Sequence, residues 1–219
     1  MMSALREVMC MLIDHGHPIL AGVLGVVAGL VLAWLLRPWT SLPPISVIGL
    51  AVLTSVLSVL IAYRFAEDPV LPAWWWLAVT GLGLALIDVS YHRLPHTWVL
   101  AMAAGGLTVF VSRAITEPAS TGLVRSLLAA LAVFAGGLVL FLAVPGWMGF
   151  GDLTTATVLA LYWGQVGWPA VLLGVIASTL LLGVVAAQVW VRTRDHSSRL
   201  AAGPSLILGG WISILTHTS

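Results

Sequence analysis

The stretch LVRSLLAALAVFAGGLVLFLAVPGWMGFGD, residues 123–152, decides how this chain folds. Its first part, residues 123–145, is an apolar run with a single charged residue near the start. A helix that crosses a bilayer needs about 20 predominantly apolar residues, so this run predicts a transmembrane helix. A Pro-Gly pair ends the run, and the motif Gly-Phe-Gly-Asp at residues 149–152 opens the next one. The stretch therefore predicts two consecutive membrane helices, with a carboxylate at the edge of the second.

The whole chain has the composition of a polytopic membrane protein. Of its 219 residues, 60% are hydrophobic and only 8% are charged, and the mean hydropathy is +1.08. These values predict an all-α bundle of membrane helices. The net charge of +1 predicts no nucleic-acid partner. The single cysteine, Cys10, excludes an internal disulfide and any Cys-x-x-Cys motif.

Apolar runs recur from one end of the chain to the other, and eight of them are candidates for membrane helices. The sixth and the eighth are short, so they need neighbouring helices to shield them from lipid. No linker is long enough to separate domains, and we expect a single membrane-embedded domain over residues 1–219. The expected helices are residues 18–36, 45–63, 72–88, 97–113, 123–145, 152–165, 167–191 and 203–216.

Residues 1–17 precede the first apolar run. Glu7, Asp14, His15 and His17 interrupt what would be the apolar core of a signal peptide, so no cleavable signal is expected. We expect a short, partly amphipathic lead-in to the first helix, with an interfacial helix as the alternative.

The arginines indicate how the helices are oriented. Eight spans put both termini on one side of the membrane. Five arginines then fall on the side opposite the termini and four on the side of the termini. The densest cluster, between Arg192 and Arg199, favours its own side as the cytoplasmic one. Asp88, which ends the third run, and Asp152, which opens the sixth, then both lie at the cytoplasmic boundary.

Asp88 and Asp152 are the strongest candidates for a functional site. A charged side chain at membrane depth costs about 3 kcal/mol, so an acidic residue there is a candidate for proton or ion chemistry. Asp152 begins its helix, where the positive end of the helix dipole favours the anion, whereas Asp88 is near a helix end that disfavours ionisation. Such an unequal pair, sharing one proton, suits the activation of a water molecule. Gly149 and Gly151 allow helices or an extended substrate to approach closely.

Three patches of sequence have a familiar order. Residues 88–95 read Asp-Val-Ser-Tyr-His-Arg-Leu-Pro, residues 149–152 read Gly-Phe-Gly-Asp, and residues 198–209 contain Ser-Arg-Leu followed by Gly-Pro-Ser-Leu. Together with eight spans, these patches resemble the type IV prepilin leader peptidases, which are bacterial intramembrane aspartyl proteases of the Gly-x-Gly-Asp type. The resemblance implies that Asp88 and Asp152 are the catalytic pair. The residues expected to support the substrate or the site are Gly149, Gly151, Arg93, Pro95, Gly203 and Pro204.

The resemblance also implies the activity and its setting. The substrates would be prepilin or pseudopilin precursors, cleaved between a short basic leader and an apolar helix. The enzyme would lie in the bacterial inner membrane with its site facing the cytoplasm, with membrane lipids as its other partners. No cofactor and no metal are expected for an aspartic pair.

Two departures from the family pattern change what is expected. Thr154 stands where the family commonly has a lysine. The cysteine-rich cytoplasmic insertion, which many members carry and which is associated with methylation of the new N-terminus, is absent. We therefore expect peptidase activity without N-methyltransferase activity.

Two other functions remain open at this point. Asp88, His92 and His96 recur every four residues, which would align them on one helix face, and Asp152 would supply a fourth ligand of a membrane metallohydrolase. Alternatively, the pair relays protons or binds a cation in a proton-coupled transporter, or merely caps helices in a non-catalytic membrane protein. The sequence has no evident internal repeat of the kind that is common in transporters.

The supporting residues have purely structural interpretations as well. Gly149 and Gly151 would then serve helix packing. Pro95 and Pro204 would mark helix ends, where proline is frequent. Arg93 would fix the topology, as the other arginines of its side do.

Overall fold

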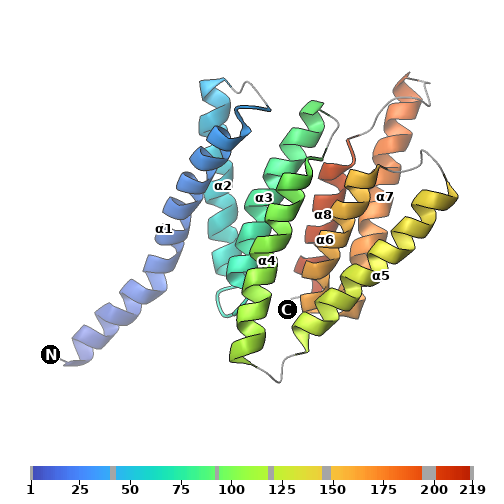
Figure 1. Ribbon diagram of the computed structural model, residues 1–219. Coiled ribbons are helices and arrows are strands. Elements are labelled where there is room, and N and C mark those ends of the chain that lie inside the picture. The colour runs from blue at the N-terminus through green and yellow to red at the C-terminus, as the bar shows by residue number, and fades with distance from the viewer. Residues whose placement is uncertain are drawn as a thin grey trace. The chain divides into compact units, whose positions relative to one another are not determined.

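The computed structural model describes residues 2–39, 43–91, 94–117, 121–144, 149–193 and 201–217. These residues form eight α-helices and no strand, which confirms the predicted all-α class (Figure 1). The helices are α1 (Met2–Leu36), α2 (Pro44–Arg64), α3 (Leu71–Tyr91), α4 (His96–Thr116), α5 (Gly122–Ala143), α6 (Phe150–Val166), α7 (Trp168–Thr193) and α8 (Gly203–His217).

The helix boundaries differ little from those expected, except at the beginning of α1. The expected first helix starts at residue 18, but α1 starts at Met2 and contains Pro18 in its interior. The expected lead-in is therefore helical and continuous with the first span. Its acidic residues and histidines exclude a long apolar core, but they do not end a helix, and no proline precedes Pro18.

The chain is a multi-pass membrane protein. Six helices, α1 to α5 and α7, contain segments that are long and apolar enough to cross a membrane. The other two are shorter, with 17 residues in α6 and 15 in α8, or about 25 and 22 Å. Large apolar side chains on α5 and α7 point outward, as lipid-facing residues do; examples are Leu131, Leu142, Leu172 and Leu180.

The chain divides into two compact units, Met1–Val79 and Thr80–Ser219. In the first unit, α1 packs closely against α2, because Gly25 lets the backbone of Ser55 approach: a Cβ at Gly25 would lie 2.5 Å from the Ser55 Cα. Asp68 caps the beginning of α3 by accepting from the Val70 amide at 2.9 Å. The expectation of one domain over residues 1–219 remains a prediction.

The short helix α6 is the core of the second unit. It packs against α4, α5, α7 and α8, and Figure 1 shows it among them. Its middle, residues 158–164, is buried on all sides, as expected for an apolar helix without a solvated face. Two of its aromatic residues bond to neighbouring backbone: the Tyr162 hydroxyl donates to the Met102 carbonyl at 2.7 Å, and the Trp163 indole donates to the Gly210 carbonyl at 3.3 Å. Neighbouring helices thus supply the shielding that its length requires.

An arginine closes the C-terminal end of α6. Arg125, in the first turn of α5, donates to the carbonyls of Gly164 and Gln165, the second at 2.6 Å. Such carbonyls have no partner within their own helix, and a cation there is favoured by the helix dipole. Gly164 lets α5 come close, since a Cβ at that position would lie 2.5 Å from the Ser126 Cα. This end of α6 is a fixed structural joint.

Candidate active site

Asp88 lies in the last turn of α3 and is almost completely buried, with 3% of its surface exposed. Its Oδ2 accepts a hydrogen bond from the backbone N–H of Gly203, with 2.6 Å between nitrogen and oxygen. Gly203 is the first residue of α8, where backbone N–H groups have no intrahelical acceptor. The carboxylate of α3 therefore meets the N-terminal end of α8.

Gly203 allows this contact because it has no side chain. A Cβ at this position would lie 3.0 Å from both the Cβ and the Oδ2 of Asp88. The next residue, Pro204, has no N–H to donate, and proline fits the first turn of a helix well. The Gly-Pro pair thus starts α8 at the place where the helix touches Asp88.

Asp152 is the third residue of α6 and is only partly buried. Its Oδ2 accepts a hydrogen bond from the Gly149 N–H at 3.1 Å. The Gly149 carbonyl in turn accepts from the amides of Asp152 and Leu153, at 3.1 and 3.2 Å. The Gly149 carbonyl thus begins the hydrogen bonds of α6, and the Asp152 side chain caps the free N–H of Gly149. The Asp152 carboxylate is held against the first turn of its own helix.

The second glycine of the motif has a different role. A Cβ at Gly151 would lie 3.2 Å from the Leu94 Cβ and 3.5 Å from the Leu94 carbonyl oxygen. Gly151 therefore lets the connection between α3 and α4 approach α6. Its carbonyl accepts from the hydroxyls of Thr154 and Thr155, at 2.9 and 2.8 Å. Thr154, at the position of the family lysine, makes a local bond within α6.

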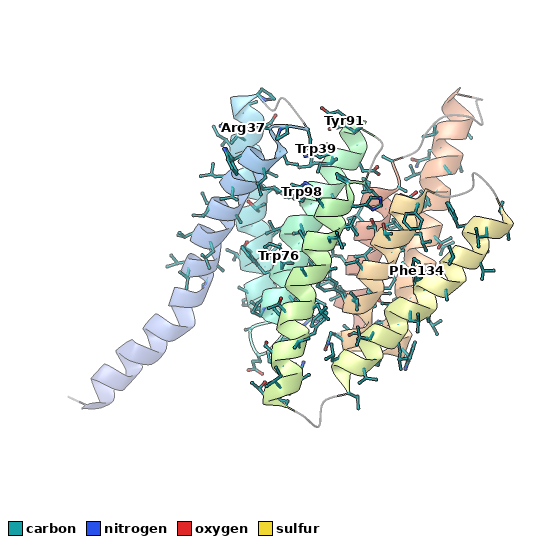
Figure 2. The ribbon with its side chains drawn as sticks, in the orientation of Figure 1. Arg37, Trp39, Trp76, Tyr91, Trp98 and Phe134 are labelled. Atoms are coloured by element: carbon teal, nitrogen blue, oxygen red, sulfur yellow. The ribbon has the colours of Figure 1, made fainter. Side chains whose placement is uncertain are left out.

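The two carboxyl groups influence one another. Burial raises the pKa of Asp152, the hydrogen bond from the Gly149 N–H lowers it, and the charge of Asp88 adds a smaller rise. The end of α3 and the beginnings of α4, α6 and α8 lie at one end of the second unit (Figure 1). Figure 2 labels two residues of this end, Tyr91, the last of α3, and Trp98, in the first turn of α4. The opposite directions of α3 and α6 thus bring Asp88 and Asp152 to the same end, as predicted from the sequence.

The expected difference in helix dipoles is not found. Asp88 does lie near the C-terminal end of α3, but its carboxylate also faces the N-terminal end of α8. Each aspartate thus accepts a backbone N–H at the beginning of a short helix, one from Gly203 and one from Gly149. Burial, rather than opposite dipoles, distinguishes the two groups.

Aromatic side chains flank the beginning of α6 on another side. The ring of Phe150 lies 6.0 Å from that of His96 on α4 and 6.1 Å from that of Phe141 on α5, measured between centroids. Both contacts are edge-to-face, a favourable arrangement for aromatic rings. His96 is thus engaged in packing at the start of α4, directly after Pro95, whose carbonyl accepts the Trp98 amide at 3.0 Å.

The helix face proposed for a metal does not form. Because α3 ends at Tyr91 and α4 begins at His96, Asp88 and His96 belong to different helices. His92 lies outside the described residues, as do Arg93, Arg194 and Arg199. In the described parts of the chain, no three histidine, cysteine, aspartate or glutamate side chains gather in a way that could hold a metal.

Sequence reasoning missed the bond between Asp88 and Gly203. The two residues are 115 positions apart, and the helix-end rule considers only the helix that carries the aspartate. The Gly-Pro pair after a polar loop signals the beginning of a helix, but it does not reveal what that beginning touches.

A family model for the type IV leader peptidase family matches residues 74–187, more than half of the chain. The match includes both aspartates and all of α4, α5 and α6, and it stops before α8. No curated protein and no solved structure matches the chain.

Proposed function

The chain belongs to the type IV leader peptidase family, and we propose that it is a membrane aspartic endopeptidase whose catalytic pair is Asp88 and Asp152. The observation that carries the proposal is that both aspartates lie at the same end of the second unit, inside the region that matches the family. Two carboxyl groups that repel one another share a proton readily, and such a pair titrates as a unit. One group is then available as a base and the other as an acid.

The pair would hydrolyse a peptide bond directly with water. One carboxylate takes a proton from a water molecule. The oxygen of that water attacks the scissile carbonyl carbon and forms the new C–O bond. The other carboxyl group gives its proton to the leaving nitrogen as the C–N bond breaks. The free carboxyl and amino termini are the products, and the pair still holds one proton, which passes back from the first carboxyl group to the second before the next cycle.

The substrates proposed are type IV prepilin or pseudopilin precursors. Their cleavage point lies between a short basic leader and an apolar helix, which suits a site at the edge of the membrane. The contact of Gly151 with Leu94 and the bond from Gly149 to Asp152 support roles for these glycines in shaping the site. Pro95 and Pro204 would support the helix ends beside it. Arg93 is proposed as a further support on the strength of the sequence alone.

We also propose the setting of the reaction. The basic residues between Arg192 and Arg199 favour the cytoplasmic side for their own loop. Both aspartates belong to the same side by helix order, so the site would face the cytoplasm from the bacterial inner membrane. Because the cysteine-rich insertion is absent, the cleaved product would keep an unmethylated N-terminus, which mass spectrometry of the product in the presence of a methyl donor would reveal.

The test uses two single variants, Asp88→Asn and Asp152→Asn, with a purified precursor as substrate. Each variant is expected to lose leader removal by about 10³-fold or more, since asparagine neither accepts nor donates the proton. The matched control is Asp68→Asn, because Asp68 also sits at a helix start but bonds to the Val70 amide and the Trp74 indole. Normal cleavage by either Asp88 or Asp152 variant would end the proposal, and loss of activity with a chelator would favour a metallohydrolase.

A further inference from the structure

A hydrogen bond joins the beginning of α8 to Asp88, from the Gly203 N–H to Oδ2. We propose that Gly203 is a positioning residue for peptide cleavage: its N–H fixes the Asp88 carboxylate relative to Asp152. This inference rests on the proposed function of the two aspartates. It adds to the catalytic site a residue from α8, which lies outside the region that matches the family.

The Gly203 N–H has no role within its own helix. The first intrahelical bonds of a helix begin about four residues along, and here the Leu206 amide bonds back to the Ala202 carbonyl at 3.0 Å. The donor at residue 203 therefore serves Asp88. Asp88 is nearly excluded from solvent, so a bond of this kind cannot be replaced cheaply by water.

The absence of a side chain at residue 203 also helps to position the Asp88 carboxylate. A Cβ at residue 203 would lie 3.0 Å from both the Cβ and the Oδ2 of Asp88, closer than an ordinary van der Waals contact. The beginning of α8 has little room to retreat, because Ala202, Ser205 and Leu206 are all buried. A methyl group at this position must therefore displace the Asp88 carboxylate.

The helix that carries Gly203 is itself anchored to α6, which carries Asp152. The Trp163 indole of α6 donates to the Gly210 carbonyl of α8, and a Cβ at Gly210 would lie 3.3 Å from the Leu159 side chain of α6. The Ser178 hydroxyl of α7 donates to the Leu206 carbonyl at 3.3 Å. Through these contacts, α8 is held against α6, the helix that carries Asp152. The hydrogen bond from Gly203 then connects Asp88 to these two helices.

The experiment removes the N–H without adding an atom. Glycolic acid in place of Gly203, introduced by nonsense suppression during cell-free synthesis into membranes, converts the amide into an ester. The full chain is then assayed on a synthetic precursor with a short basic leader ending in glycine, followed by an apolar helix. We expect kcat to fall about 10- to 100-fold, the range of one hydrogen bond to a charged group. KM is expected to stay within about twofold, because Gly203 contacts Asp88 rather than the substrate.

The control is the corresponding ester at Leu208, introduced as the hydroxy-acid analogue of leucine, because Leu208 lies in the middle of α8 with its side chain exposed. That change removes an intrahelical hydrogen bond and should lower the thermal unfolding temperature. Its kcat should remain close to that of the unchanged chain. A second variant, Gly203→Ala, is expected to lower kcat while the chain stays folded, because alanine favours the helix but displaces Asp88.

The outcomes separate this inference from the proposed function. If the ester at Gly203 leaves kcat unchanged, or lowers it no more than the ester at Leu208, the inference is wrong even when Asp88→Asn is inactive. If Asp88→Asn is fully active, the proposed function fails first and the positioning role fails with it. A rise in KM with unchanged kcat would also overturn the inference, because it would mean that Gly203 acts on substrate binding.

Discussion

The two ends of α6 are built in opposite ways. At the C-terminal end, the Arg125 guanidinium meets the carbonyls of Gly164 and Gln165, so a positive charge faces the negative end of the helix. At the N-terminal end, the Asp152 carboxylate accepts one backbone N–H and lies within the electrostatic influence of a second carboxylate.

The difference between the two ends indicates that one end of α6 contributes mainly to stability and the other mainly to activity. Opposite charges and satisfied carbonyls at one end favour a fixed joint. At the other end, burial and the neighbouring carboxyl group oppose the ionisation of Asp152, an arrangement that is typical of functional sites. Changes at the first end should therefore alter unfolding, and changes at the second should alter activity.

The largest effect is expected at the N-terminal end. Asp152→Asn should abolish leader removal, by about 10³-fold or more, while the thermal unfolding temperature stays the same or rises. The physical reason is that a neutral amide ends the repulsion from Asp88 but still accepts the Gly149 N–H. Cleavage kinetics and thermal unfolding in detergent, measured on the same preparation, check the expected loss of activity and the expected unfolding temperature. A large fall in unfolding temperature would show that this end is a structural joint too.

The next effect belongs to the C-terminal end. Arg125→Ala leaves two helix-end carbonyls without their donor and should lower the free energy of unfolding by about 2–4 kcal/mol. Folded protein should keep nearly normal kcat. Arg125→Lys keeps the charge but not the forked donors of the guanidinium. Its free energy of unfolding should lie between those of Arg125→Ala and the unchanged chain. A selective loss of kcat in Arg125→Ala, without loss of stability, would contradict the division between the two ends.

A smaller loss of stability is expected where α5 and α6 approach. In Gly164→Ala, the new Cβ would stand 2.5 Å from the Ser126 Cα, so the helices must separate, at about 1–3 kcal/mol. Gly136→Ala is the control, because a Cβ there has nothing within 4 Å and alanine favours the helix. Calorimetry should thus show opposite shifts for the two variants, and equal shifts would refute the close contact.

The smallest effect is expected at Thr154. Its hydroxyl shares the Gly151 carbonyl with Thr155, so Thr154→Val should lower stability by about 0.5–1 kcal/mol and leave kcat within tenfold of normal. The same assay on Thr155→Val gives the comparison. If Thr154→Val alone abolished cleavage, the residue at the family's lysine position would have a direct part in the chemistry.

Much of the fold could be predicted from local sequence. Apolar runs and Pro-Gly breaks are sufficient to locate helix ends, because a membrane helix must satisfy its own backbone and stops where the chain turns polar. The order of the helices was also sufficient to predict that Asp88 and Asp152 lie at one end, because successive helices cross the membrane in alternating directions. The start of α1 was missed because hydrophobicity marks where a helix enters lipid, not where its hydrogen bonds begin.

The rest of the site depends on contacts between distant segments. The bond from Gly203 to Asp88 joins residues 115 positions apart, and a rule about helix ends cannot detect a second helix that arrives from elsewhere in the chain. The alternative metal-binding face does not form, for a local reason. Pro95 disfavours helix for the residue before it, so α3 ends at Tyr91 and His96 starts a new helix.

The most direct test asks whether Asp88 and Asp152 share one site, independently of activity. In a Cys10→Ser background, Asp88→Cys with Asp152→Cys is treated in native membranes with a short thiol-specific cross-linker, and the linked peptides are identified by mass spectrometry. The positive control pairs Leu94→Cys with Gly151→Cys, whose positions touch. The negative control pairs Asp152→Cys with Ser126→Cys, because Ser126 packs against Gly164 at the far end of α6.

We expect the aspartate positions to link about as readily as the positive control. Linking no better than that of the negative control, while the positive control reacts, would contradict a shared catalytic site.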